Sequence, residues 1–151
     1  MNSYEIRVGT SAGDLAALFL DVSSIADYFL LVVRPDLKLS RSGTALLEDI
    51  APWLDRSWES SEWPGTKLLT GTVKILRYRD PHRVVTCCLG RVVSPFAFAQ
   101  PDYPEDPCLL RADQSPIFTT ISHERDAYLN LEPFEFQRLT ELSQHELTIS
   151  K

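Results

Sequence analysis

The spacing of apolar residues predicts two strands and a helix near the N-terminus. Residues 4–8 alternate as a short strand does, and the unbroken apolar run at residues 28–33 is typical of a buried strand. Between them, Leu15, Leu18 and Phe19 fall on one helical face after a group of capping residues. The pattern therefore predicts a strand, a helix and a buried strand in this order.

A second helix is predicted after Ser40 or Ser42. Its apolar positions have the spacing of one buried helix face, and they are Leu46, Leu47, Ile50, Trp53 and Leu54. Pro52 lacks the N–H that the helix ladder needs, so the pattern does not fix the last turn.

The middle of the chain predicts a loop followed by strands. Residues 55–65 are polar apart from Trp58 and Trp63, and they end at a Pro-Gly turn. Strands are predicted over residues 67–78, 84–89 and 92–98. A turn at residues 80–82 separates the first two of these strands.

The last third predicts a proline-rich loop, a hairpin, a strand and a closing helix. The loop covers residues 100–107, and the hairpin joins residues 108–111 to residues 117–121. A short strand is expected at residues 128–131. The helix opens at residues 132–135, with Pro133 at a first-turn position and Phe136, Leu139 and Leu142 on its buried side.

This order indicates an α+β fold in one globular domain covering residues 1–151. We expect a mostly antiparallel sheet of four to six strands, with helices mainly on one face. The length of 151 residues and the 44% hydrophobic content suit a single domain with its own core.

Composition and charge limit the cell compartments and the classes of partner that we expect. We see no signal peptide and no apolar run long enough for a membrane span, and three cysteines at 87, 88 and 108 are a poor disulfide framework. A cytoplasmic location without membrane contact is expected. The net charge is −6, with a basic stretch at residues 67–91 between acidic flanks, which favours a basic protein partner over nucleic acid.

Two segments are candidates for contact with a partner. Trp58 and Trp63 lie in the predicted polar loop, and exposed tryptophan is a frequent interface anchor. The alternative is that both rings pack against their own domain. The proline-rich loop presents four further candidates: Asp102, Tyr103, Glu105 and Asp106. Its carboxylates could hold Arg or Lys of a partner, or a hard cation, although the spacing of a calcium loop is absent.

A second polar cluster is formed by His123, Glu124, Arg125 and Asp126. If this cluster were a strand, His123 and Arg125 would share one face, and a carboxylate could orient the imidazole for acid–base chemistry. A zinc-protease helix would need a second histidine at position 127, which is alanine.

The basic strands offer a weaker candidate for single-stranded nucleic acid through Arg77-Tyr78-Arg79, although pairing with the protein's own carboxylates accounts for them as well. No phosphate loop, nucleophile elbow, paired CxxC or zinc spacing occurs, so no metal and no cofactor are expected.

The leading hypothesis is a non-catalytic protein-interaction domain of a bacterial type, for example an immunity protein that neutralises a basic toxin. The alternative is a small enzyme or ligand-binding domain that uses His123 with nearby carboxylates.

Overall fold

The computed structural model describes residues 2–6, 12–142 and 149–150. Its helices are α1 (Ala12–Ser23), α2 (Arg41–Ile50), α3 (Pro81–Leu89) and α4 (Pro133–Leu142). Its strands are β1 (Asn2–Ile6), β2 (Tyr28–Val33), β3 (Leu54–Ser60), β4 (Glu62–Trp63), β5 (Thr66–Lys67), β6 (Val73–Tyr78), β7 (Glu105–Leu110), β8 (Pro116–Ile121), β9 (Asp126–Leu131) and β10 (Ile149–Ser150).

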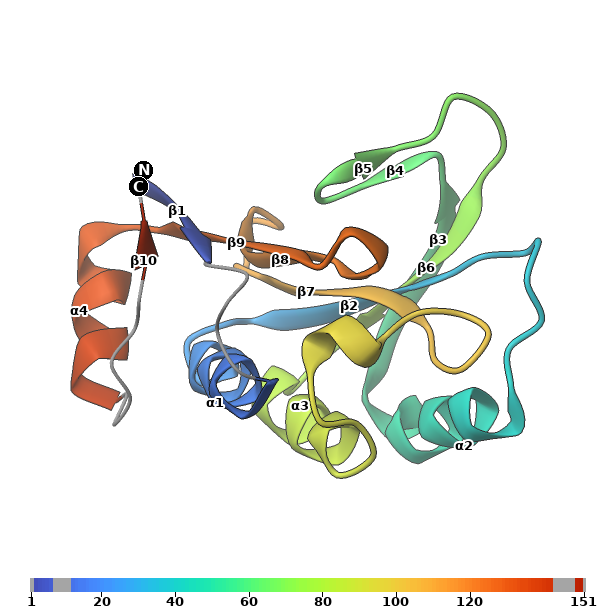
Figure 1. Ribbon diagram of the computed structural model, residues 1–151, viewed down its shortest axis with the longest axis horizontal. Helices are drawn as coiled ribbons and strands as arrows, with labels where there is room; N and C mark the ends of the chain where they lie inside the picture. Colours follow the sequence, from blue (N-terminus) through green and yellow to red (C-terminus); the bar gives the residue numbers. More distant parts are fainter. Residues whose placement is uncertain (1, 7–11, 143–148, 151) are drawn as a thin grey trace.

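One antiparallel sheet organises the molecule (Figure 1). Its strand order is β10-β1-β9-β8-β7-β2-β6-β3, and every pairing within it is antiparallel. Six adjacent strands, β9 to β3, form its body, and β1 with the two-residue β10 extends one edge. Strands β4 and β5 form a separate small hairpin.

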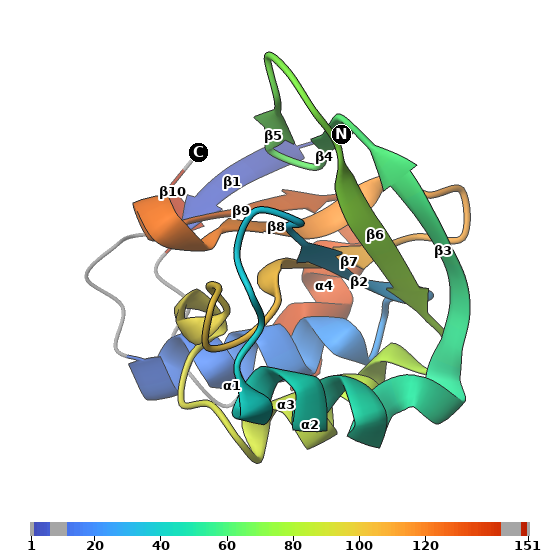
Figure 2. The ribbon, with the colours of Figure 1, turned by 90° about the vertical axis from the view of Figure 1, so that its right-hand side faces the viewer.

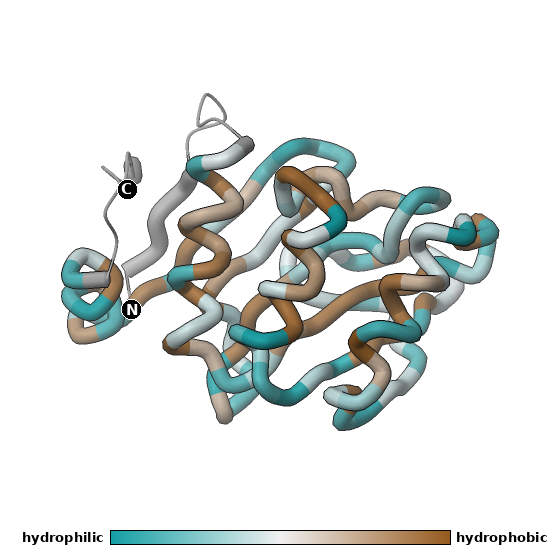
Figure 3. Tube along the Cα trace, turned by 90° about the horizontal axis from the view of Figure 1, so that it is seen from below, coloured by the Kyte–Doolittle hydropathy of each residue, from teal (hydrophilic) through white to brown (hydrophobic). Residues whose placement is uncertain are grey.

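The two faces of the sheet are covered differently. Helices α1, α2 and α3 lie below one face, and the β4–β5 hairpin projects over the other (Figures 1 and 2). Viewed from the helical side, the helices alternate hydrophobic and hydrophilic positions along their turns (Figure 3), as helices with one buried face do. The expected α+β class, antiparallel sheet and helices mainly on one face are confirmed.

The main core lies between the sheet and the helices. Phe19 of α1 packs edge-to-face on Phe118 of β8 with ring centroids 4.8 Å apart, and it also contacts Phe29 of β2 at 6.2 Å. All three rings are fully buried. Edge-to-face contacts add to the free energy gained by burying the rings, so these aromatics fix α1 against the sheet.

Several predicted elements occur where the pattern placed them. The strand at residues 28–33 is β2, and the helix carrying Leu15, Leu18 and Phe19 is α1. The predicted hairpin corresponds to β7 and β8, and the strand at 128–131 lies within β9. Ser40 caps α2, its hydroxyl oxygen accepting a hydrogen bond from the Gly43 N–H at 3.1 Å.

The predicted strand at residues 84–89 is wrong, because this segment is helix α3. Its β-branched residues suggested a strand, but Val84, Val85 and Cys88 fall on one helical face and are buried. Pro81 occupies the first turn, where its missing N–H costs no hydrogen bond. The predicted strand at 92–98 is also wrong, because Pro95–Ala97 forms a 3-10 turn.

The predicted loop at residues 55–65 is wrong as well, because it contains most of β3 and all of β4. Strand β3 lies at the edge of the sheet and is largely exposed, so it lacks the apolar alternation by which a half-buried strand is recognised. Pairing with β6, which the local sequence does not reveal, holds it in the extended conformation.

Helix α4 begins as predicted, but its buried side differs. Leu139 is buried, whereas Phe136 is 39% exposed, and the side chain of Leu142 lies outside the described residues. A largely buried ion pair anchors the helix instead. Nε of Arg111 donates to Oε2 of Glu135 at 3.0 Å, and Nη2 of Arg111 donates to Oε1 of Glu135 at 2.6 Å. This bidentate geometry ties the β7–β8 hairpin to the first turn of α4.

None of the helices in the described parts of the chain has the length and apolar character that crossing a bilayer requires.

The three cysteine thiols are free. Cys88 belongs to the core on the helical side and Cys108 to the cluster on the opposite face, and both are buried. Cys87 and Cys88 both lie on α3, in the segment for which a strand was predicted.

We predict that denatured, unreduced protein contains three titratable thiols, because the cysteines are unpaired and two of them lie on opposite faces of the sheet. Thiol titration in guanidinium chloride measures this number directly. A result of one thiol would show that a disulfide forms in solution and would contradict the prediction.

Candidate functional site

A hollow on the face of the sheet opposite the helices is the most developed candidate site. We call it the aromatic hollow; its volume is about 230 Å³. Its lining residues are Leu30, Arg56, Trp58, Glu62, Trp63, Pro64, Ile75, Arg77, Leu110 and Gln114. The sheet supplies an apolar floor, and the β4–β5 hairpin supplies a wall.

Alternation along the strands separates this floor from the main core. In β2, Phe29 and Leu31 face the helices, whereas Leu30 and Val32 belong to a second cluster with Ile75. Trp58 and Trp63 pack on this second cluster and are only partly buried. Both indoles therefore present apolar surface to the hollow while one side of each rests on the sheet.

Strand β3 directs Arg56 and Trp58 to the hollow together, because residues two apart on a strand share a face. The guanidinium carbon of Arg56 lies 5.3 Å from the centre of the Trp58 ring, which is a cation–π contact. Within the part of the chain that the structure describes, no carboxylate lies within 4 Å of Arg56. The charged guanidinium of Arg56 therefore lies at the rim of the hollow without a carboxylate partner among the described residues.

Arg77 lines the same hollow but is held by the protein itself. Its guanidinium forms an ion pair with Asp55, donates to Oε1 of Gln114 at 2.8 Å, and lies 4.4 Å from the ring centre of Tyr28. These contacts satisfy the cation, so Arg77 acts as a fixed part of the wall.

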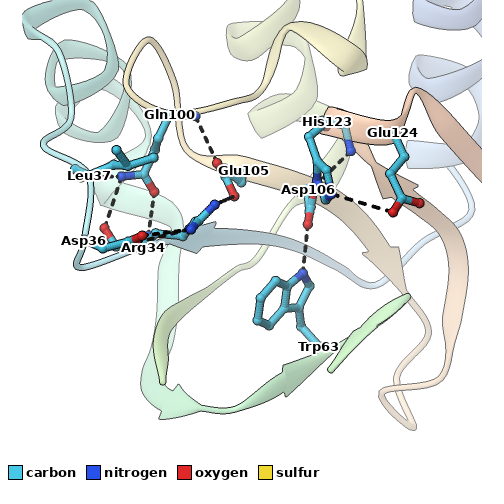
Figure 4. A network of polar contacts seen from close by, with 10 residues as sticks. Arg34, Asp36, Leu37, Trp63, Gln100, Glu105, Asp106, His123 and Glu124 are labelled. Atoms are coloured by element: carbon cyan, nitrogen blue, oxygen red, sulfur yellow. Dashed lines mark hydrogen bonds and ion pairs between the residues drawn. The ribbon is translucent and has the colours of Figure 1, made fainter. Parts of the chain in front are cut away.

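A buried carboxylate positions Trp63 in the hairpin that forms the wall of the hollow (Figure 4). The indole N–H of Trp63 donates to Oδ2 of Asp106 at 2.9 Å, and the backbone N–H of Ser122 donates to Oδ1 of the same carboxylate at 2.9 Å. Asp106 is 2% exposed and has a positive φ of 51°. One side chain therefore joins the hairpin, strand β7 and the turn after β8.

Glu105 lies beside Asp106 in a second buried polar network. Its Oε1 accepts a hydrogen bond from the Gln100 N–H at 3.3 Å, and its Oε2 is 3.8 Å from Nη1 of Arg34. Burial raises the pKa of the Glu105 carboxyl above its usual value, although the Gln100 N–H and Arg34 favour the charged form. The side-chain amide of Gln100 also donates to the carbonyls of Arg34 and Leu37, at 3.1 and 2.7 Å, which ties the segment after β2 to this network.

The expectation of an exposed acidic loop is wrong for Glu105 and Asp106. Both residues lie in β7 and are buried, so their carboxylates face the protein's own hydrogen-bond donors. Every residue of β7 is buried, so the strand shows no polar–apolar alternation, and Pro107 within it argued against a strand. Asp102 remains exposed, and Tyr103 packs against Phe98 with ring centroids 5.9 Å apart. A role for these residues in partner binding stays a prediction.

The second polar cluster forms a turn instead of a strand. Residues Ser122–Glu124 are a 3-10 turn, Arg125 has a positive φ of 57°, and β9 begins at Asp126. The side chains of His123 and Glu124 are 62% and 56% exposed, with Nε2 and Oε1 3.7 Å apart. The face that His123 and Arg125 would share in a strand is therefore not formed, and Arg125 lies over the Phe96 ring at 5.9 Å.

The basic segment pairs with the protein's own groups. Arg77, Arg83 and Arg91 form ion pairs with Asp55, Asp80 and Asp49, respectively. Arg79 donates to the Pro52 carbonyl at 3.1 Å. The described residues hold no group of three or more His, Cys, Asp or Glu side chains suited to a metal ion.

Sequence reasoning missed three residues of the site region: Arg56, Gln100 and Arg34. The side-chain amide of Gln100 reaches Arg34 and Leu37 across 66 and 63 positions of the chain, so the local sequence does not reveal these contacts. Arg56 stands two residues before Trp58, a spacing that would have placed both on one face had the strand been recognised.

We predict that Asp106→Asn destabilises the protein by about 1–3 kcal/mol, because the amide cannot accept from both N–H groups and one buried donor loses its partner. Urea denaturation measures the change in the free energy of unfolding. Asp102→Asn is the matched control, since it makes the same change at an exposed position of the same segment. Equal effects of the two substitutions would contradict the assigned role of Asp106.

We predict a pH-dependent difference between the wild type and Glu105→Gln. A carboxyl with a raised pKa ionises less readily in the folded than in the unfolded state, so ionisation opposes folding. The contribution of Glu105 is therefore most favourable at low pH and declines as the pH rises past the usual carboxyl range. Glu105→Gln should lack this decline, so its stability relative to the wild type should increase between about pH 4 and pH 7. Urea titrations across this range would oppose the prediction if the relative stability stayed constant or fell.

The comparisons with known proteins add no relative to this description. A scan against protein-family models, a search of curated proteins and a search of solved structures found no match for this chain. The features of this chain that bear on its function are the aromatic hollow, the buried Asp106 carboxylate beside it and the charge distribution.

Proposed function

We propose that this protein is a non-catalytic protein-interaction domain that binds its partner at the aromatic hollow. The observation that carries the proposal is the pair of partly buried indoles, Trp58 and Trp63, standing around an apolar floor on the open face of the sheet. Tryptophan side chains set in such pockets provide much of the binding free energy in protein interfaces.

The support beneath the hollow favours tight binding. Asp106 holds the Trp63 indole, and Arg77 is fixed by Asp55 and Gln114. A binding surface whose side chains are already ordered loses less conformational entropy when a partner docks. The buried polar groups thus serve the interface indirectly, by fixing the groups that a partner would touch.

The charge of the chain suggests the kind of partner. The net charge is −6, and Glu62 adds a carboxylate to the hollow. An acidic protein attracts a basic one over long distances and speeds their association. An immunity protein that neutralises a basic toxin in the cytoplasm is the finer form of this proposal, and it rests on composition by analogy.

The alternative function, a small enzyme or ligand-binding domain using His123, has weaker support. The side chains of His123 and Glu124 are mostly exposed, and their closest polar atoms are 3.7 Å apart. A general base works best when a neighbour orients it within hydrogen-bond distance. The aromatic hollow does not include either residue among its lining.

We predict that Trp58→Ala weakens partner binding by about 2 kcal/mol or more, because truncating an interface tryptophan removes a large apolar contact. Tagged wild-type protein and the variant are used to capture partners for mass spectrometry, and the affinity of the recovered partner is then measured by calorimetry. Thermal unfolding of each variant checks that the fold is retained.

Phe134→Ala is the matched control, since it removes an aromatic side chain that is 58% exposed on α4. The proposal requires this variant to bind as the wild type does. A partner that binds Trp58→Ala normally but loses affinity for Phe134→Ala would place the interface on α4 and refute the proposal.

A further inference from the structure

Strand β3 ends the sheet and has an unpaired outer edge. Among the described strands it pairs with β6 alone, over a register from Leu54↔Tyr78 to Ser60↔Val73. Figure 2 shows it at the border of the molecule, with no other labelled element on its outer side. Every second N–H and C=O group of an edge strand points away from its neighbour, so this edge offers backbone hydrogen bonds to an added strand.

The residues of β3 block such pairing only in part. Proteins protect exposed edges with very short strands, charged side chains (lysine above all), proline or bulges. The opposite end of the described sheet follows this rule, since it finishes in the two-residue β10. Strand β3 has seven residues and contains neither lysine nor proline, and its charged residues are Asp55, Arg56 and Glu59. Its one irregularity, a register shift between Leu54 and Arg56, leaves the remaining pairs from Arg56 to Ser60 continuous.

The same edge borders the aromatic hollow. Arg56 and Trp58 both belong to β3 and both line the hollow. A strand added beside β3 would continue the sheet, and its side chains on this face would stand next to those two residues. Backbone pairing would supply affinity and the hollow would supply selectivity, as in other cases of strand addition.

The chemistry of Arg56 and Trp58 selects the added side chains. Arg56 has a ring beneath it but no carboxylate within 4 Å among the described residues, so an acidic side chain directly opposite would complete an ion pair. Trp58 offers a partly buried ring that a large apolar side chain would cover.

We propose that β3 is a strand-addition site for an extended segment of the partner protein, with an apolar residue opposite Trp58 and an acidic residue opposite Arg56. Antiparallel pairing is the arrangement found throughout this sheet. In that direction the partner's segment carries the apolar residue first and the acidic residue two positions later. This inference rests on the proposed function and specifies how the same hollow is occupied.

The pattern is compatible with a basic partner. Net charge acts across the whole surface and sets the rate of encounter, whereas the residue opposite Arg56 acts locally within the docked complex. A basic protein meets both conditions if one of its segments carries an apolar residue, then any residue, then an acidic residue (the apolar–any–acidic pattern).

The test uses the full chain and random seven-residue peptides displayed on phage, matching the length of β3. Selected peptides are synthesised, and their affinity is measured by fluorescence anisotropy. We expect enrichment of the apolar–any–acidic pattern. We also expect Arg56→Glu to weaken binding at least about tenfold, since it places like charges side by side. Replacing the acidic residue of the peptide by lysine should restore binding to this variant and weaken binding to the wild type.

Arg83→Glu is the matched control, because Arg83 also lies over a tryptophan, at 5.9 Å from the Trp53 ring centre, but belongs to α3. It should bind the peptides as the wild type does. Hydrogen–deuterium exchange should show slower exchange of the β3 amides on peptide binding. Equal effects of Arg56→Glu and Arg83→Glu, unchanged exchange in β3, or no enriched pattern would each overturn the inference.

Two further outcomes separate this inference from the proposed function. If the captured partner needs Trp58 but binds Arg56→Glu with unchanged affinity, the interaction domain stands and strand addition is refuted. If light scattering shows a dimer whose β3 amides lose protection on dilution, a second copy of this chain occupies the edge, and the inference of a partner segment is overturned.

Discussion

Burial of both faces of strand β2 is the constraint on which the rest of the structure depends. Phe29 and Leu31 face the helices, while Leu30 and Val32 face the other way, and all four are buried. A strand that is apolar on both faces needs cover on both sides. Three helices provide it below the sheet, and the β4–β5 hairpin provides part of it above (Figure 2).

The cover on the hairpin side is small, and this gives the protein a site. Helices pack closely over their face, whereas the hairpin lies over only part of its own and leaves the aromatic hollow open beside β3. Because the hairpin brings few apolar residues, it is also secured by a polar contact, the hydrogen bond from Trp63 to the buried Asp106 carboxylate. Structural support and candidate binding surface are thus made by the same residues.

The sequence was informative where hydrophobic burial follows a local period. It predicted β2, α1, α2, the β7–β8 hairpin and the start of α4, and with them the α+β class. It also marked Trp58 and Trp63 as candidates, because large apolar residues in a polar stretch stand out without any knowledge of the fold. It failed for α3, where β-branched residues at helical spacing resembled a strand, and for β3, whose exposed residues carry no period.

What the sequence by itself determined is therefore the class of fold and the residues that burial selects. The tertiary structure alone decided the environment of the polar groups. Glu105 and Asp106 look like solvent-exposed charges in a proline-rich stretch, yet β7 carries them inward to meet Arg34 and Trp63. Burial of a charge requires partners, and those partners come from distant segments that only long-range strand pairing brings together.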